Sequence, residues 1–123
     1  MTPTYLVTGP SARAREAAIA ARFQAGDAAI LEGLPDGKAD APLQGHTSLH
    51  RIAPGCLCCT GNLVLRVTLN RLLRQAPSRL FIALADPTHL ATLHAMLAAA
   101  PYGALLALKE SVAAADTDFK TPT

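Results

Sequence analysis

The chain has 123 residues and a net charge of +2 with its histidines neutral, and 50% of its residues are hydrophobic against 16% charged. This length fits one compact domain, and the apolar share supports a packed core, which excludes a disordered chain and a second domain. The arginines are scattered, and Trp is absent beside three Phe and two Tyr. The interleaved basic and aromatic surface of a single-strand nucleic-acid binder is therefore missing, and we expect no nucleic acid as a partner.

The N-terminus carries no basic stretch followed by an apolar segment of signal-peptide length, and no segment approaches a membrane span. All three cysteines, Cys56, Cys58 and Cys59, lie within four positions. A secreted disulfide framework would instead spread an even number of cysteines through the chain. We therefore expect a cytoplasmic protein with reduced thiols and no contact with a membrane.

The first third of the chain predicts a strand, a helix and a second strand. Residues 4–8 form a β-branched and aromatic run that stops at Gly9-Pro10, which is typical of a buried strand followed by a turn. Ser11 can cap a helix that runs through Phe23, and Gly26 is placed to end it. Residues 27–31 form the second predicted strand.

The middle of the chain predicts a loop, a short strand and the clearest amphipathic helix. Residues 33–45 lack periodicity and are rich in Gly and Pro, which indicates a surface loop, and residues 48–52 give a weak strand signal. Asn62 can cap the following helix, which has an apolar face and an outer face. The apolar face carries Leu65, Leu69, Leu72 and Leu73, and the outer face carries Arg66, Asn70, Arg71 and Arg74.

The last third predicts a strand at 80–85, a helix at 88–99 and a final strand at 104–108. The run at 80–85 is continuously apolar, as in a strand covered on both faces, and Asp86-Pro87 supplies a cap and a first residue for the helix. Alternating strands and helices imply right-handed crossovers and a mainly parallel sheet. The sequence therefore predicts a three-layer α/β domain of four or five strands over residues 1–112, followed by a polar tail at 113–123.

In parallel α/β folds, ligands bind at the carboxyl ends of strands, so the first strand-to-helix loop is a candidate site. Against the phosphate-binding pattern G-x-x-x-x-G-K-[ST], Gly9 matches, whereas Ala14, Arg15 and Glu16 replace the second glycine, the lysine and the hydroxyl residue. Glu16 places negative charge where magnesium and triphosphate would lie. The loop is thus a degenerate Walker A motif, and Gly9, Arg13 and Arg15 form at most a weak residual anion site. In the alternative, Arg13 and Arg15 are solvated surface charges, paired with Glu16.

The three cysteines point to a metal site, because clustered thiolates select zinc, copper(I) or a related soft ion. Three thiolate ligands leave one of the four coordination positions of a tetrahedral ion unfilled. His46 or His50 is a candidate for the fourth ligand, as are water, a client protein and a cysteine from a second copy of the chain. The alternative is that the cysteines are small buried hydrophobic residues. His89 and His94, five residues apart on a predicted helix, are expected to be structural, and Asp86 is expected to be a helix cap.

The segment Gly55-Cys56-Leu57-Cys58-Cys59-Thr60, the amphipathic helix after it and the strand ending Leu84-Ala85-Asp86-Pro87 resemble the CobW-type metallochaperone GTPase family. The order and spacing of these landmarks after Gly9 also resemble that family, over roughly residues 4 to 112. The resemblance implies a P-loop NTPase-like fold in which C-x-C-C thiolates bind zinc or cobalt, and in which nucleotide turnover drives transfer of the metal to a client metalloprotein.

The chain departs from the family in three places. The first loop is degenerate, Leu80 and Ala83 stand at the acidic and glycine positions before Ala85-Asp86-Pro87, and the sequence ends before the guanine-selecting motif and the C-terminal domain. We therefore expect a metal-binding protein that does not hydrolyse GTP, with a client or a second copy of the chain as its partner. Two alternatives stay open, a divergent GTPase and a protein-interaction scaffold that binds no metal.

Overall fold

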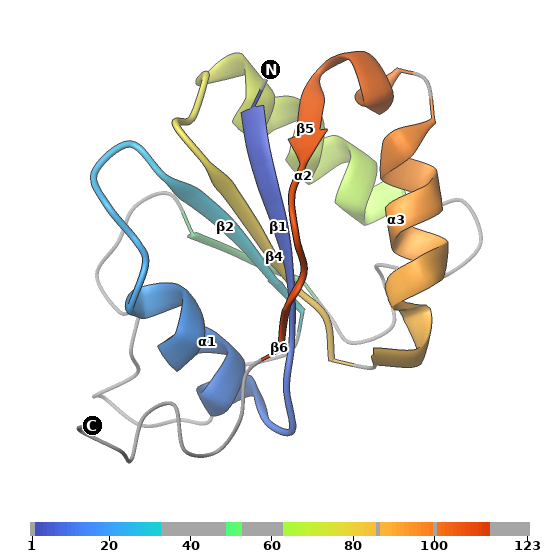
Figure 1. Cartoon of the computed structure of the whole chain (residues 1–123). Coiled ribbons are helices and arrows are strands. Elements are labelled where there is room, and N and C mark those ends of the chain that lie inside the picture. Colours follow the sequence, from blue (N-terminus) through green and yellow to red (C-terminus); the bar gives the residue numbers. More distant parts are fainter. Residues whose placement is uncertain (1, 33–48, 53–62, 86, 100, 114–123) are drawn as a thin grey trace.

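The computed structural model describes residues 2–32, 49–52, 63–85, 87–99 and 101–113, which form one sheet with helices on both faces (Figure 1). The sheet has six strands in the order β3-β2-β4-β1-β5, and β6 pairs with β1 beyond the end of β5. Every strand pair is parallel. The strands are β1 (Thr2–Thr8), β2 (Ala28–Glu32), β3 (Leu49–Ile52), β4 (Leu80–Ala83), β5 (Leu106–Leu108) and β6 (Val112–Ala113).

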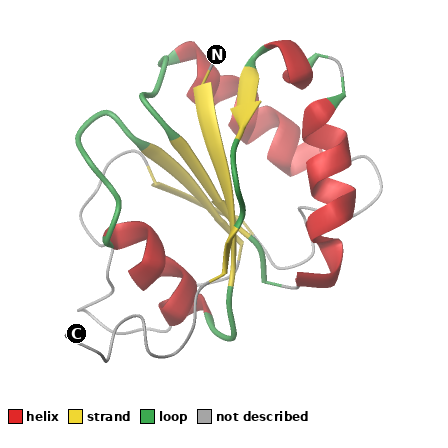
Figure 2. Ribbon diagram, viewed as in Figure 1, coloured by secondary structure: helices red, strands yellow, loops and turns green. Residues whose placement is uncertain are grey.

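The described residues form three α-helices, which cover opposite faces of the sheet (Figure 2). The helix α1 (Ala12–Ala20) packs on one face, and α2 (Leu63–Arg74) and α3 (Leu90–Ala98) pack on the other. Two short 3₁₀ helices, η1 (Pro87–His89) and η2 (Tyr102–Ala104), flank α3. This arrangement confirms the prediction of a three-layer α/β domain with a parallel sheet.

The hydrophobic core is divided by the sheet into two clusters, as alternation of side chains along a strand requires. On the α1 face, Phe81 of β4 is fully buried and stacks on Tyr5 of β1 with ring centroids 5.3 Å apart. On the other face, Ile82 of β4 packs among leucines of α2 and α3, and these are Leu65, Leu69, Leu72, Leu93 and Leu97. All four residues of β4 are buried, which explains its continuously apolar sequence.

Several predicted boundaries differ by a few residues from those in the structure, and two of the differences have a local cause. The first helix ends at Ala20 instead of Phe23, and the chain then turns through Gly26, whose φ of +92° is readily adopted only by glycine. The last predicted strand begins at Leu106, because the residues before it form η2. The ring of Tyr102 is buried there, and its hydroxyl donates to Asn70 Oδ1 of α2 at 3.1 Å.

The strand β6 was not predicted, and it lies beyond an irregularity at the sheet edge. Leu108 pairs with Thr4 and Val112 pairs with Val7, so four steps along the edge match three steps along β1. The extra residue makes a bulge at Lys109–Ser111, three residues that are all exposed. A bulge with charged side chains is a common way to make a sheet edge a poor template for pairing with another chain.

Within the ranges that the structure describes, no helix combines the length and the apolar character needed to cross a membrane.

Candidate functional site at the carboxyl edge of the sheet

The carboxyl ends of four parallel strands meet the start of α1 along one edge of the sheet. There β1 ends at Thr8 and is followed by Gly9, while β2, β3 and β4 end at Glu32, Ile52 and Ala83. The Ser11 side chain caps α1 by accepting a hydrogen bond from the Ala14 amide at 3.0 Å, which confirms the predicted cap. The first turn of α1 is therefore fixed at the edge where ligands of such folds bind.

Arg15 is buried at this edge, with 5% of its surface exposed. Its Nη1 donates to the Gly9 carbonyl at 3.0 Å, so the side chain folds back onto the first loop. No acceptor for its Nε is found among the described residues, although that atom is inaccessible to solvent. The alternative in which Arg15 is a solvated surface charge is therefore wrong.

Two carboxylates help to keep the Arg15 guanidinium charged. Burial lowers its pKa from the ordinary value, and the negative charges of Glu32 and then of Glu16 raise it again in part. An arginine remains protonated under all physiological conditions, so Arg15 is a buried cation that relies on these two neighbours. Positive charge thus persists where the phosphate-binding lysine would lie, but carboxylates of the chain already face it.

Glu16 pairs with Arg51 of β3. The two guanidinium nitrogens Nη1 and Nη2 of Arg51 lie 2.7 and 2.9 Å from the two carboxylate oxygens. The Glu16 side chain is 6% exposed and that of Arg51 is 24% exposed, so the pair is largely shielded from water. This two-pronged contact holds the first turn of α1 to the edge strand β3.

Glu32, the last residue of β2, is the third charged side chain at this edge after Arg15 and the Glu16–Arg51 pair. Its Oε1 accepts a hydrogen bond from the Ala85 amide at 2.7 Å, just beyond the end of β4, and the residue is only 4% exposed. Glu32 was not among the site residues predicted from the sequence. The available signal was an acidic residue directly after a buried apolar strand, where burying a charge is favourable only if it finds a partner.

We call Arg15, Glu16, Glu32 and Arg51 the edge quartet. It combines two positive with two negative side chains, which are contributed by α1, β2 and β3. Both oxygens of Glu16 and one oxygen of Glu32 are hydrogen-bonded to protein donors. In this arrangement the carboxylates that face the first loop are neutralised by arginines, and little net positive charge is left for a triphosphate.

The predicted metal ligands are divided between described and undescribed parts of the chain. Cys56, Cys58, Cys59 and His46 lie outside the described residues, as does Asp86. The described residues contain no group of three His, Cys, Asp or Glu side chains able to hold a metal. The cysteine segment lies in the chain between Ile52, where β3 ends at the carboxyl edge, and Leu63, where α2 begins.

His50 lies on β3 and is half-buried. It is paired in register with Ile30, which belongs to the core on the α2 and α3 side, whereas Arg51 is paired with Leu31 on the α1 side. Alternation along the strand therefore places His50 and Arg51 on opposite faces. The histidine belongs to the face covered by α2, the helix that follows the cysteine segment.

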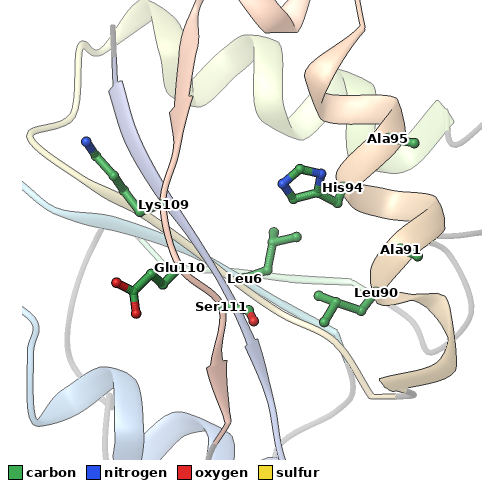
Figure 3. Close-up of a pocket in the computed structure, with 8 residues that line it drawn as sticks. All are labelled: Leu6, Leu90, Ala91, His94, Ala95, Lys109, Glu110 and Ser111. Atoms are coloured by element: carbon green, nitrogen blue, oxygen red, sulfur yellow. The ribbon is translucent and has the colours of Figure 1, made fainter.

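A separate hollow of about 510 Å³ lies between α3 and the bulge (Figure 3). Leu6 of β1 forms part of its floor, Leu90 and His94 of α3 line one wall, and the side chains of Lys109 and Glu110 point away from α3. His94 is exposed. The hollow contains none of the predicted site residues.

Fold and site together define this chain as an α/β protein with a parallel sheet and a charge-neutralised site at its carboxyl edge. Comparisons with models of protein families, with curated proteins and with solved structures found no significant match.

Proposed function

We propose that the protein is a CobW-like cytoplasmic metal-binding protein that holds zinc or a similar ion through Cys56, Cys58 and Cys59 and does not hydrolyse nucleotide. The observation that supports this proposal is the edge quartet. It fills the place of the phosphate site with one ion pair and with hydrogen bonds to the backbone, while the chain keeps three thiols in the segment that follows β3 in the sequence.

Nucleotide turnover needs donors that are free to bind phosphate and a ligand for magnesium. Arg15 donates instead to the Gly9 carbonyl, and Glu16 stands where a hydroxyl would hold the metal. Releasing Glu16 for another role would break its two-pronged contact with Arg51 in a largely buried setting, at a cost of about 2 to 4 kcal/mol. The geometry therefore supports a protein with a P-loop-like architecture that does not catalyse phosphate transfer.

Metal binding requires different groups. Thiolates bind zinc without help from a phosphate site, and the segment after a strand at the carboxyl edge is a common position for ligands in parallel folds. His50 lies six residues before Cys56, on the face that α2 covers, and it remains a candidate fourth ligand with His46. A ligand from a client protein or from a second copy of the chain can complete the coordination of the ion in place of either histidine.

Cobalt(II) substitution offers a direct test under reducing, anaerobic conditions. The wild-type protein is expected to show an intense thiolate-to-cobalt charge-transfer band, with saturation at one ion per chain or one ion per two chains. Cys58→Ser should lose most of this band and bind zinc at least tenfold more weakly. His94→Ala is the matched control and should change neither. Equal, negligible binding by wild type and Cys58→Ser would remove the proposal.

The divergent GTPase is tested by a titration with GTP and magnesium. We expect no saturable binding at millimolar nucleotide, because the arginine at position 15 is already bound to the first loop. Saturation below that concentration, lost in Arg15→Ala but not in Arg22→Ala, would favour the GTPase over our proposal.

A further inference from the structure

The outer face of α2 is a ridge of arginines that faces away from the core. Turning by about 100° per residue, the helix places Arg66, Val67, Asn70, Arg71 and Arg74 on one continuous arc of about 140°. Val67, Asn70, Arg71 and Arg74 are exposed and Arg66 is half-buried, whereas Leu65, Leu69 and Leu72 on the opposite side are fully buried. We call this arc the α2 ridge.

The arginines of the ridge form no ion pair with any carboxylate in the described part of the chain. The sequence of α2 contains no acidic residue. Three of the four described acidic residues are buried in the fold. Glu16 pairs with Arg51, Asp27 pairs with Arg79 at 2.6 Å, and Glu32 closes the carboxyl edge, so that only Glu110 is exposed.

The described residues carry more basic than acidic side chains. They hold eight arginines and one lysine against four acidic residues, and three of these four acidic residues are buried, whereas Arg15 is the one buried arginine among them. The three arginines of the ridge lie within about 12 Å along one helix and repel one another. Arg71 and Arg74, in the last turn, also interact favourably with the negative end of the helix dipole, which is their one stabilising contribution to α2. The ridge is better suited to a partner than to the isolated chain.

We propose that the α2 ridge is a docking surface for an acidic segment of another protein, one that alternates carboxylates with apolar side chains. The carboxylates pair with Arg66, Arg71 and Arg74, and an apolar side chain covers Val67, which is 49% exposed in the middle of the arc. Arginine forks suit carboxylates because they donate two parallel hydrogen bonds. This inference goes beyond the proposed metal site and does not depend on it.

Two other polyanions fit the ridge less well. A nucleic-acid backbone has no apolar group to cover Val67, and three arginines over two helical turns give a short electrostatic footprint. A membrane surface would need an apolar helix face directed outward, but the apolar face of α2 is in the core. An acidic protein segment supplies both the charge and the apolar contact.

The test uses a fluorescently labelled peptide of alternating glutamate and leucine pairs, titrated with the full chain in the presence of a chelator so that metal has no part in the result. We expect saturable binding that weakens with added salt. Arg71→Gln with Arg74→Gln should weaken it about tenfold, since two exposed ion pairs are lost. The control, Arg22→Gln with Lys109→Gln, removes the same charge elsewhere on the surface and should change the affinity less than twofold.

A second variant tests the apolar contact. Val67→Ser should weaken binding of the glutamate–leucine peptide roughly threefold and leave binding of poly-glutamate unchanged. Melting temperatures of all variants check that each one folds. Equal effects of the two double variants would overturn the inference and indicate general charge attraction. Tighter binding of a single-stranded oligonucleotide or of phosphatidylserine vesicles through the same arginines would overturn it too.

Discussion

The Glu16 carboxylate and the Arg51 guanidinium form a two-pronged ion pair, with oxygen-to-nitrogen distances of 2.7 and 2.9 Å, that joins α1 to the edge strand β3. The two residues are 35 positions apart in the chain. Among the described strands β3 pairs only with β2, and the ion pair adds a contact between this strand and α1. The same contact pairs the positive charge of Arg51 with a carboxylate of α1.

Glu16→Gln is expected to lower the free energy of unfolding by about 2 kcal/mol, because Arg51 loses its charged partner in a setting with little water. Chemical denaturation measures this change. Glu110→Gln is the control, since that residue is exposed, and its effect should stay within about 0.5 kcal/mol. Equal effects of the two variants would contradict the structural role of the pair.

Arg79 and Asp27 form a second buried pair, at the opposite end of β2 and β4. Hydrogen bonding to Asp27 raises the pKa of Arg79, and its guanidinium also lies 5.2 Å from the ring centre of Phe81. Arg79→Lys keeps the charge but loses the fork and the ring contact, so we expect a loss of about 1 kcal/mol. Asp27→Asn should cost more, about 2 kcal/mol, because its side chain is 1% exposed. Thermal and chemical unfolding should rank the two variants in this order.

Ala76 has a φ of +50°, a conformation that alanine rarely adopts. Ala76→Gly is therefore expected to raise the free energy of unfolding by about 0.5 to 1 kcal/mol. Ala95→Gly is the matched control, because the same change in the middle of α3 should lower stability by about 1 kcal/mol. If both variants were destabilised to the same extent, the positive φ would not be a source of strain.

Gly103 lies where η2 folds back on α3. A Cβ at this position would lie 2.2 Å from the Ala98 carbonyl oxygen, a backbone atom that cannot move without distorting the end of the helix. Gly103→Ala should lower stability by about 2 kcal/mol and shift the amide resonances of Ala98 and Tyr102. Ala104→Ser, at the exposed neighbouring position, should leave stability and spectra nearly unchanged. An alanine variant as stable as wild type would show that η2 can shift freely.

Metal removal gives a prediction that depends on the proposed function. If zinc binds the folded chain, a chelator should lower the melting temperature of zinc-loaded protein, because a ligand specific to the folded state adds to its stability. With zinc at 100 times its dissociation constant, the loss is about 2.7 kcal/mol. Cys58→Ser should melt at the same temperature with and without chelator.

The order of the elements could be predicted from the sequence because their signals are local. The continuously apolar run of β4 and the leucine spacing of α2 depend only on residues within a few positions of one another. Ser11 as a helix cap is also a local relation, between a hydroxyl and an amide three residues later. These signals determined the three-layer α/β fold. They did not determine β6, whose two residues pair only because a bulge returns the chain to β1.

The edge quartet could not be predicted in the same way. The sequence drew attention to Arg15 and Glu16, yet it suggested pairing between neighbours on α1. The partner of Glu16 comes from β3, and the carboxylate of Glu32 reaches an amide 53 residues further along the chain. Such pairs are fixed by which strands become neighbours and by how far each side chain is removed from water.

By itself, the sequence determined that this chain forms alternating strands and helices, that it gathers its three cysteines in one segment, and that its first loop lacks the residues of a phosphate site. Only the tertiary structure decided which charges are buried against each other and that the arginines of α2 stay outside without partners among the described residues. The physical reason is that periodicity is a property of neighbouring residues, whereas the energy of a charge depends on everything that surrounds it in space.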